Sequence, residues 1–357
     1  MTSVLHVQKV SGISGSEGHL LSLLPLLRDG GWDARMLVLH EGEPGAAEFV
    51  ERLRTAGVPV EAWRMRLDLS PTVFFRLLAR RLPTIVHTHL VHADVLALPA
   101  AALRRVPVRI STKHGFNAFR ANKALSAVDR AAARLAHRQI AISGGLASYL
   151  TATQGYPADA FTVVHYGIDA VPEPPPPDVP TRLLAVGRLM EIKGFDVLLR
   201  AFAAARREVP ELTLELAGAG PLDASLRSLA PEGVTFLGRV PPAPAYERNA
   251  IVVVPSRGEG FGLVALEAAE RGRAAIVSDV GGLPEIVADG RTGLVVPVGD
   301  EPALTAAIVE LARDPERVRM LGAAARRRAV EEFSAEAAAA GVEAVYREEL
   351  EKRNLRP

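Results

Sequence analysis

The chain contains no cysteine among its 357 residues, which excludes disulfide bonds and thiolate metal sites. No apolar run approaches the roughly 20 residues that a membrane-spanning helix needs. The first ten residues lack the basic-then-apolar order of a signal peptide. Acidic and basic residues almost balance, with a formal net charge of +1, so composition makes no general case for a nucleic-acid partner. These features predict a globular, cytoplasmic protein.

Two residue types are unevenly distributed. All nine histidines lie between His6 and His165, so the two halves of the chain differ in character. Lysine is scarce, because arginine supplies nearly all of the 42 basic residues. A chain of this length is too long for one ordinary hydrophobic core, and we expect two domains.

Short β-branched runs alternate with apolar-periodic helical runs, which is typical of parallel sheets with crossover helices. In the first half we expect strands at Val4–Val10, Arg35–Leu39, Thr84–His89, Val106–Thr112, Gln139–Ile142 and Phe161–His165, and helices such as His19–Arg28, Ala46–Ala56 and Ser126–Ala136. In the second half we expect strands at Arg182–Val186, Leu212–Leu216, Val234–Phe236, Ile251–Val254, Ala274–Val277 and Gly293–Val296, followed by an almost wholly helical tail from Ala303 to Arg353.

The stretch Val171–Pro180 reads VPEPPPPDVP. Proline at this density favours an extended spacer over a helix or a central strand. We interpret it as a linker between two Rossmann-like halves, and a long surface loop within one domain is the alternative. The predicted boundaries are a domain at 1–171, a linker at 172–180, a second domain at 181–334 and a final helix at 335–357. The fold class is α/β, and we expect the ligand in the cleft between the halves.

One cationic pair follows the first strand of the second half. Gly187 ends that strand, and a helix begins near Gly194. Arg188 and Lys193 therefore lie at the carboxyl edge of a parallel sheet, beside a helix N-terminus, where anions bind. Arginine forks onto two phosphate oxygens and lysine supplies a point charge, so the pair suits a pyrophosphate. Solvated loop charges are the alternative.

The stretch GEGFGLVALEAAERG raises a different question. Its helix, Leu263–Ala269, is apolar almost all round and should be buried, so the carboxylate of Glu267 is costly unless something hydrogen-bonds it. Glu259 lies eight residues earlier, about two helical turns away. A ligand that bridges the two would be elongated, with hydroxyls at both ends. Alternatively, Glu259 favours the helix dipole and Glu267 pairs with Arg271.

Four segments of the second half follow one another as GRLMEIKG, AGAGP, FLGRV and PSRGEGFGLVALEAAERGRAAIVSDVGGLPEIVADGRTGLVVPVGD. In order and spacing they resemble the retaining, nucleotide-sugar-dependent glycosyltransferases of family 4 (glycosyltransferase group 1). The resemblance extends over nearly the whole chain. It implies a GT-B fold, in which two Rossmann-like domains with parallel sheets face each other across a cleft. The first domain would then be the acceptor side, the second would bind the nucleotide-sugar donor, and the helix at 335–357 would return to the first.

The resemblance also implies roles for individual residues. Arg188 and Lys193 would hold the donor diphosphate, and Glu267 the ribose hydroxyls. Glu259 would lie against the donor sugar, together with the backbone of residues 260–262. The implied catalytic residues are Arg188, Lys193, His114 and Glu259. The implied donor-binding residues are Gly15, Gly187, Gly218, Arg239, Val240, Gly260, Phe261, Gly262, Leu263, Val264 and Glu267.

Fragments of the same family occur in the first half. The loop SGISGSEGH has the spacing Gly12-x-x-Gly15-x-x-Gly18, which is not that of dinucleotide binders. The resemblance brings Gly15 close to the donor phosphates, and a plain turn is the alternative. In ISTKHG it places His114 near the reacting centre, whereas an isolated loop histidine is usually solvated. Lys113, beside His114, either contributes to the same site or is there by chance. The family often has asparagine at Tyr166, to which we assign no role.

Two further histidines, His87 and His89, alternate along one expected strand and therefore share a face. They look like half of a zinc site, but no third ligand is evident. We expect them to line the cleft or to pack in the core.

The reaction implied by the resemblance moves a hexose-type sugar from a UDP- or GDP-linked donor to an acceptor hydroxyl, with retention of configuration. We expect no metal and no cofactor besides the nucleotide-sugar co-substrate, and the chain has no Asp-x-Asp in a suitable loop. The acceptor is a glycan, a lipid-linked group or a small molecule. Alternatives are a sugar-nucleotide epimerase or phosphorylase of the same fold, and an NAD(P)-dependent oxidoreductase built on Gly218-x-Gly220, whose usual third glycine is replaced by Asp223.

Between Arg104 and Arg138 there are nine basic residues and one acidic residue, Asp129. Such a stretch could attract a phosphorylated acceptor or an anionic membrane surface. A solvated basic helix face is an equal alternative, so a peripheral membrane contact stays open.

Overall fold

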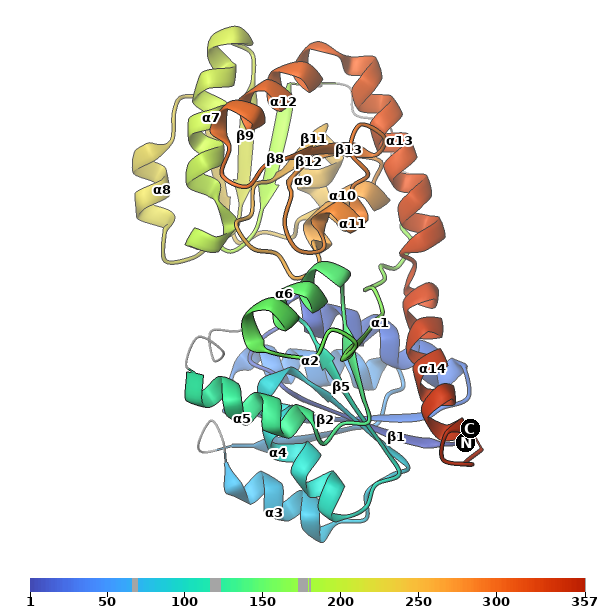
Figure 1. Cartoon of the computed structure of the whole chain (residues 1–357). Coiled ribbons are helices and arrows are strands. Elements are labelled where there is room, and N and C mark those ends of the chain that lie inside the picture. The colour runs from blue at the N-terminus through green and yellow to red at the C-terminus, as the bar shows by residue number, and fades with distance from the viewer. Residues whose placement is uncertain (66–69, 116–122, 173–178, 180, 357) are drawn as a thin grey trace. The chain divides into compact units, whose positions relative to one another are not determined.

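The structure is a computed structural model that describes residues 1–65, 70–115, 123–172, 179 and 181–356. The chain divides into two compact units. The first consists of Met1–Asp169 and Ala335–Pro357, and the second of Ala170–Ser334; both are drawn in Figure 1. Most of the predicted linker, residues 173–178 and 180, lies outside the described residues.

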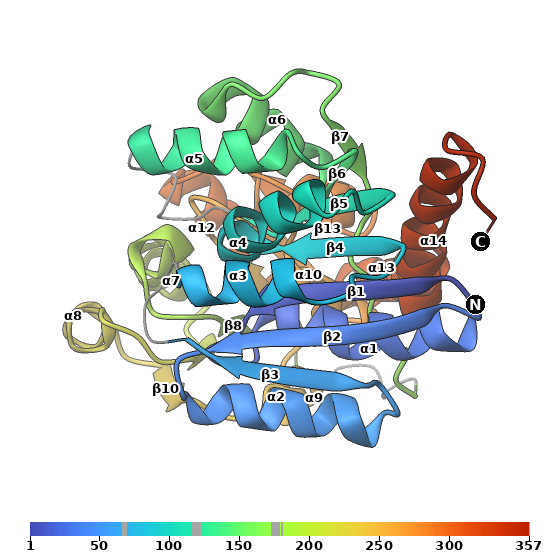
Figure 2. The same cartoon turned by 90° about the horizontal axis from the view of Figure 1, so that it is seen from below.

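In the described part of the first unit, seven parallel strands form one sheet in the order β3-β2-β1-β4-β5-β6-β7. Figure 2 shows β3, β2, β1 and β4 side by side in this order. The strands are β1 (Ser3–Lys9), β2 (Asp33–His40), β3 (Val60–Arg64), β4 (Ile85–His89), β5 (Val108–Lys113), β6 (Arg138–Ala141) and β7 (Phe161–Val163). The helices are α1 (Gly15–Asp29), α2 (Pro44–Thr55), α3 (Pro71–Ala79), α4 (Leu90–Leu103), α5 (Lys123–Ala133), α6 (Gly144–Gln154) and α14 (Ala335–Glu351).

The central strands of this sheet carry buried apolar residues on both faces because helices cover both. On one face Val4 and Val38 pack in a cluster with residues of α1, α2 and α14. On the other face Leu5 and Leu37 pack with residues of α3 and α4. The sequence predicted no strand at β3, since most of its side chains are exposed at the sheet edge and only Trp63 is buried.

Helix α14 belongs to the first unit. Val342, Tyr346 and Leu350 lie in the same buried cluster as Val4 of β1. The hydroxyl of Thr2 donates to the carbonyl of Arg356 at 3.3 Å, and the two ends of the chain lie close together in Figure 1. The final helix therefore completes the hydrophobic core that the first strand begins.

In the described part of the second unit, six parallel strands have the order β10-β9-β8-β11-β12-β13. The strands are β8 (Arg182–Val186), β9 (Thr213–Ala217), β10 (Val234–Gly238), β11 (Ile251–Val254), β12 (Ala274–Ser278) and β13 (Gly293–Val296). The helices are the 3-10 helix η2 (Glu191–Lys193), α7 (Phe195–Glu208), α8 (Asp223–Leu229), α9 (Ala243–Arg248), α10 (Leu263–Glu270), α11 (Leu283–Ile286), α12 (Glu301–Arg313) and α13 (Pro315–Glu332).

In each sheet the direction in which successive strands are added reverses once. The order of strands reverses between β1 and β4 in the first unit and between β8 and β11 in the second. Open parallel sheets bind ligands beyond the carboxyl ends of the strands at such a point. The loops that follow these four strands are therefore where a site is expected in each unit.

Candidate functional site

Predicted site residues of the second unit follow four neighbouring strands. Gly187 and Arg188 come after β8, Gly218 after β9, and Arg239 after β10. Glu259 lies in the loop between β11 and α10. The parallel topology thus brings these residues to one edge of the sheet, with Arg188 and Glu259 on the two sides of the point where strand order reverses.

A short ion pair joins the two loops at this point. Lys193 Nζ lies 2.6 Å from Glu259 Oε2, and their side chains are 23% and 17% exposed. Ser256 donates a longer hydrogen bond to the same oxygen, at 3.4 Å. Arg188 is exposed, and within the described residues its guanidinium has no ion-pair or hydrogen-bond partner. One cation is therefore paired and the other is available to an anion.

The turn that carries Lys193 is fixed by a neighbouring arginine. Both terminal nitrogens of Arg257 contact the two carboxylate oxygens of Asp196 at 2.7 Å, and Nη1 also donates to the carbonyl of Glu191. The hydrogen bonds and charge of Arg257 lower the pKa of Asp196 below its usual value. Gly194 has φ +65°, and a Cβ there would lie 2.0 Å from the carbonyl oxygen of Pro255. Only glycine allows the turn to approach this closely.

The glycine-rich segment brings its backbone, rather than its aromatic ring, to the edge. Gly260, Gly262, Leu263 and Val264 lie at or before the start of α10, as predicted. The side chain of Phe261 is 2% exposed and its ring packs against that of Phe333 in the core. Only the main chain of Phe261 can therefore contact a ligand.

The partner of Glu267 is a tyrosine that the sequence interpretation missed. Tyr246 Oη donates to Glu267 Oε2 at 2.7 Å. Burial raises the pKa of Glu267, and the hydrogen bond from Tyr246 opposes this by lowering it. The alternative pair with Arg271 does not form in the described structure, because Arg271 Nη1 lies 2.9 Å from Glu270 and donates to the main-chain oxygen of Glu267.

In the first unit Gly15 is the first residue of α1. The backbone N–H of Ser14 donates to the carboxylate of Glu17 at 3.1 Å, and Gln8 Nε2 donates to the other oxygen of Glu17 at 2.5 Å. A buried carboxylate thus already satisfies part of this helix N-terminus. Gly15 keeps its predicted role only if a phosphate reaches the backbone beside Glu17.

His114 follows β5 and lies at one end of a hydrogen-bonded run of side chains. Its Nε2 is 2.8 Å from His89 Nδ1, and its Nδ1 is hydrogen-bonded to the hydroxyl of Tyr166. Tyr166 stacks on His19 with ring centroids 4.3 Å apart, so the residue without a predicted role is a direct partner of His114. The run, which we term the histidine–tyrosine chain, comprises Thr112, His87, Tyr346, His6, His89, His114 and Tyr166.

The prediction that His87 and His89 lack a third metal ligand is wrong. His6 on β1 pairs in register with His87 on β4, and one ring nitrogen from each of the three histidines lies within 4.8 Å of the others. These buried rings could hold a metal ion. In the structure their nitrogens are instead hydrogen-bonded, with His6 Nδ1 2.9 Å from His89 Nε2. Burial lowers the pKa of all three, to about 3 for His6, so the rings are neutral at pH 7.

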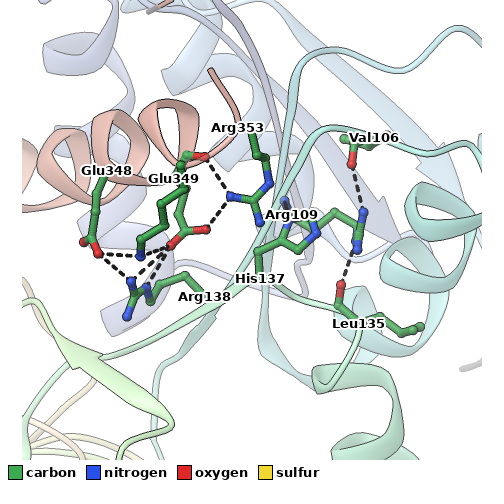
Figure 3. Close-up of polar contacts among 9 residues, drawn as sticks. Val106, Arg109, Leu135, His137, Arg138, Glu348, Glu349 and Arg353 are labelled. Atoms are coloured by element: carbon green, nitrogen blue, oxygen red, sulfur yellow. Dashed lines mark hydrogen bonds and ion pairs between the residues drawn. The ribbon is translucent and has the colours of Figure 1, made fainter. Parts of the chain in front are cut away.

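Lys113 is not part of an exposed site. It is fully buried, with Nζ 2.5 Å from Asp94 and 3.4 Å from Asp129. Two other basic residues of the same stretch are also engaged (Figure 3): Arg109 donates to the carbonyls of Leu135 and Val106, and Arg138 pairs with Glu348 and Glu349 of α14. This reduces the charge available to an anionic surface. Among the described residues, no helix has the length and apolarity to cross a membrane.

Known proteins resemble both units. Residues 13–171 match the family described as Glycosyltransferase Family 4, and residues 180–314 match Glycosyl transferases group 1. The alpha-maltose-1-phosphate synthase of Mycolicibacterium smegmatis is 33% identical over 299 residues, which cover 70% of this chain and 75% of that protein. The GDP-mannose-dependent alpha-(1-6)-phosphatidylinositol monomannoside mannosyltransferase of the same organism is 29% identical over 332 residues, covering 81% and 84%.

Solved structures agree on the fold. Anabaena HepE, in complex with UDP and glucose, has a TM-score of 0.82 at 20% identity and covers 98% of this chain and all of its own. Sucrose-phosphate synthase from Thermosynechococcus elongatus has a TM-score of 0.78 at 22% identity, covering 99% and 100%. The predicted GT-B class of two parallel-sheet α/β domains is thereby confirmed.

Proposed function

Since the chain belongs to the group 1 glycosyltransferases, we propose that it transfers a hexose from a UDP- or GDP-sugar to an acceptor hydroxyl, with retention of configuration. The observation that carries this proposal is the arrangement at the carboxyl edge of the second sheet. An exposed arginine, the Lys193–Glu259 pair and the glycine-rich start of α10 lie there, and Glu267 follows on α10 itself. These groups suit a ligand that carries an anionic group, such as a diphosphate, between parts that carry hydroxyl groups.

Leaving-group stabilisation is the main demand of the reaction. As the bond between the anomeric carbon and the phosphate oxygen breaks, its electron pair moves to the diphosphate. Arg188, Lys193 and the free N–H groups at the start of α10 supply positive charge for that developing anion. Because these groups belong to the protein, we propose that no metal ion is required.

Retention follows from a displacement on one face of the sugar. The acceptor oxygen bonds to the anomeric carbon on the side that the diphosphate leaves, and the acceptor proton passes to the departing phosphate oxygen. No covalent enzyme nucleophile takes part. Glu259 is engaged with Lys193 at 2.6 Å, which suits a carboxylate that orders the lysine and accepts from a sugar hydroxyl.

The nucleotide class has support from named relatives. A similar mannosyltransferase is described as GDP-mannose-dependent, and the structurally similar HepE binds UDP and glucose. We therefore propose a uridine or guanosine diphosphate as carrier, with a glycan, a lipid-linked group or a small molecule as acceptor.

Calorimetric titration with UDP, GDP, ADP and NAD tests the proposal. We expect one nucleoside diphosphate to bind with a micromolar Kd, and Glu267→Ala to weaken it by about tenfold or more, the scale of a lost charge-assisted hydrogen bond. The matched control is Glu310→Ala on α12, which removes an exposed carboxylate of the same unit and should leave the Kd unchanged.

Three results would contradict the proposal. Binding of NAD alone would favour an oxidoreductase, and the absence of binding by any diphosphate to the folded protein would remove the basis for sugar transfer. Once a donor is known, its conversion without transfer to an acceptor would favour an epimerase.

A further inference from the structure

Tyr246 and Glu267 form a part-buried pair between two helices of the second unit. Tyr246 lies on α9 and Glu267 on α10, 21 residues apart in sequence, and the hydroxyl–carboxylate distance is 2.7 Å. Tyr246 is fully buried, and it is the second unit's only tyrosine. Burial and the nearby charge of Glu267 raise the pKa of Tyr246 well above its ordinary value. The hydroxyl therefore keeps its proton and donates it.

The end of α9 holds the tyrosine in place. Arg273, itself fully buried, donates from Nε to the main-chain oxygen of Tyr246 at 2.8 Å and from Nη2 to that of Glu247 at 3.1 Å. The amide of Asn249 donates to the carbonyl of Ala245 at 2.8 Å. A tyrosine has two side-chain torsions, so a fixed backbone and a packed ring leave its hydroxyl little freedom.

The two oxygens of the Glu267 carboxylate differ. Oε2 accepts from Tyr246, whereas Oε1 has no hydrogen-bond partner among the described residues. The guanidinium of Arg271, whose charge acts on Glu267, is paired with Glu270 at 2.9 Å. An ionised carboxylate oxygen has room for two donors. One oxygen is thus anchored and the other is left for two adjacent hydroxyls.

We propose that Tyr246 is a positioning residue, whose hydroxyl holds Glu267 Oε2 so that Oε1 accepts from the vicinal diol of the nucleotide ribose. This inference rests on the proposed function, because it takes a nucleoside diphosphate as the ligand. It adds a residue that does not touch the ligand and acts through Glu267. A tyrosine that only fills space would neither hold Glu267 Oε2 nor affect how Oε1 binds the ligand.

The pair also sets the pH range of binding. The carboxylate has to be ionised to accept both hydroxyls, and burial raises the pKa of Glu267. The hydrogen bond from Tyr246 and the charge of Arg271 lower this pKa, while Glu270 raises it. From α13, Arg326 donates to the main-chain oxygen of Glu270. Removing the Tyr246 hydroxyl leaves burial less opposed, so the loss of binding in acid should move to higher pH.

The experiment measures the Kd of UDP, GDP and ADP by calorimetry across pH 5 to 8 for the wild type, Tyr246→Phe and Glu267→Gln. We expect Tyr246→Phe to weaken the preferred diphosphate about tenfold at pH 7, the scale of one hydrogen bond to a charged group. The acid limb should shift upward by about one pH unit. Glu267→Gln should show no acid limb from this site, since the amide does not titrate.

A nucleotide analogue separates positioning from packing. The 2′-deoxy form of the preferred diphosphate should bind about tenfold more weakly than the parent to the wild type, but only about twofold more weakly to Tyr246→Phe, because the two changes act on one carboxylate. The matched control is Tyr156→Phe in the first unit, where the tyrosine hydroxyl also donates to a carboxylate, that of Asp129, at 3.1 Å. It should behave as the wild type.

The outcomes are distinguishable. If the wild type binds a diphosphate and Tyr246→Phe matches it in Kd, pH profile and 2′-deoxy penalty, the inference is overturned and the proposed function stands. If the folded wild type binds none of the three, both fail. A third outcome is that Tyr246→Phe binds the diphosphate more weakly but keeps the wild-type pH profile and the full 2′-deoxy penalty. In that case the variant has lost packing alone, and the positioning role is also overturned.

Discussion

The first unit holds all nine histidines and both tryptophans of the chain, whereas the second holds neither residue type. Beside its strand reversal the first unit places neutral rings, buried and bonded to one another. The second places charges there, partly exposed and paired across two loops. One topology therefore supports two electrostatic environments at equivalent places.

The difference predicts how each unit responds to protons. A buried neutral histidine resists protonation, while the unfolded chain takes up a proton near pH 6.5. The ion-paired carboxylates of the second unit also resist protonation, since Arg257, for example, lowers the pKa of Asp196, but an unfolded carboxyl group takes up a proton only near pH 4. Stability gained by the histidines is lost as the pH falls below 6.5, and that gained by such carboxylates only below about pH 4.

The largest expected effect is selective unfolding of the first unit in acid. The pKa of His6 and His19 is lowered to about 3, so each costs about 2 kcal/mol of stability between pH 6.5 and pH 5, or 1.4 kcal/mol per pH unit. Burial also lowers the pKa of His87, His89 and His114, which adds to the loss. Because Trp32 and Trp63 both belong to the first unit, their fluorescence reports it alone.

Urea unfolding followed by tryptophan fluorescence and by circular dichroism checks this. The urea midpoints recorded at pH 8 by both methods serve as the reference. At pH 5 the midpoint followed by fluorescence should fall well below the midpoint of the circular dichroism signal that remains, which comes from the second unit. Fluorescence midpoints that do not move between pH 8 and pH 5 would contradict the buried neutral histidines.

Next in size is the effect of removing a cation from the second unit. We expect Lys193→Ala and Arg188→Ala each to lower turnover of the donor by about 100-fold or more, the scale of losing one preorganised group that stabilises a leaving anion. Initial rates with the donor found by calorimetry measure this. The fluorescence-detected unfolding of the first unit should not change. Near-normal rates for both variants would show that the charges at this edge do not serve the reaction.

A smaller effect is expected where the first unit's neutral network is broken. Tyr346 Oη lies 2.6 Å from His87 Nδ1 and 3.1 Å from His6 Nε2. Tyr346→Phe leaves buried ring nitrogens without a partner and should lower the free energy of unfolding by about 1–3 kcal/mol. Urea unfolding at pH 8, followed by fluorescence, measures it. Tyr246→Phe is the matched change in the second unit. An equal shift of the fluorescence midpoint for this variant would refute the assignment of the lost stability to the Tyr346 hydrogen bonds.

The smallest effect concerns surface charges of the first unit. Arg138 contacts Glu348 at 2.6 Å and Glu349 at 3.1 Å on α14 (Figure 3). Glu348 is half exposed, and the buried Glu349 keeps Lys352 and Arg353 as partners. Arg138→Ala should therefore cost less than about 1 kcal/mol, and less still at high salt. Arg313→Ala, which removes an exposed pair with Glu208 in the second unit, should not move the fluorescence transition. A salt-independent loss for Arg138→Ala would point to packing instead.

Sequence reasoning located the strands that are buried on both faces. The bounds of β8, β11 and β13 agree with those predicted, because a short apolar run between turn residues leaves little choice. It missed β3, whose edge position removes the apolar pattern. The loops of the proposed donor site were found because their glycines and charges are contiguous in the chain.

The partners of those residues were harder to find. Nothing near Glu267 in the sequence points to Tyr246, since their contact depends on how α9 packs on α10. His6 could have been found as the third ring beside His87 and His89. The usual order of a doubly wound sheet makes the first and fourth strands neighbours, and the alternation of side chains then places the three rings on one face.

The histidine–tyrosine chain has a consequence for counting protons. Each neutral imidazole carries one N–H and each tyrosine one O–H, and every link needs a single proton. If one ring reverses its tautomer, one of its links holds two protons and the other none. Reversal of the next group only moves the fault along, so the faults disappear only when every group has reversed. Two faultless arrangements remain, in which all groups donate toward Thr112 or all toward Tyr166. The tautomers therefore switch as one two-state unit, and the hydroxyl of Tyr166 changes between donor and acceptor according to the opposite end, with no movement of the backbone.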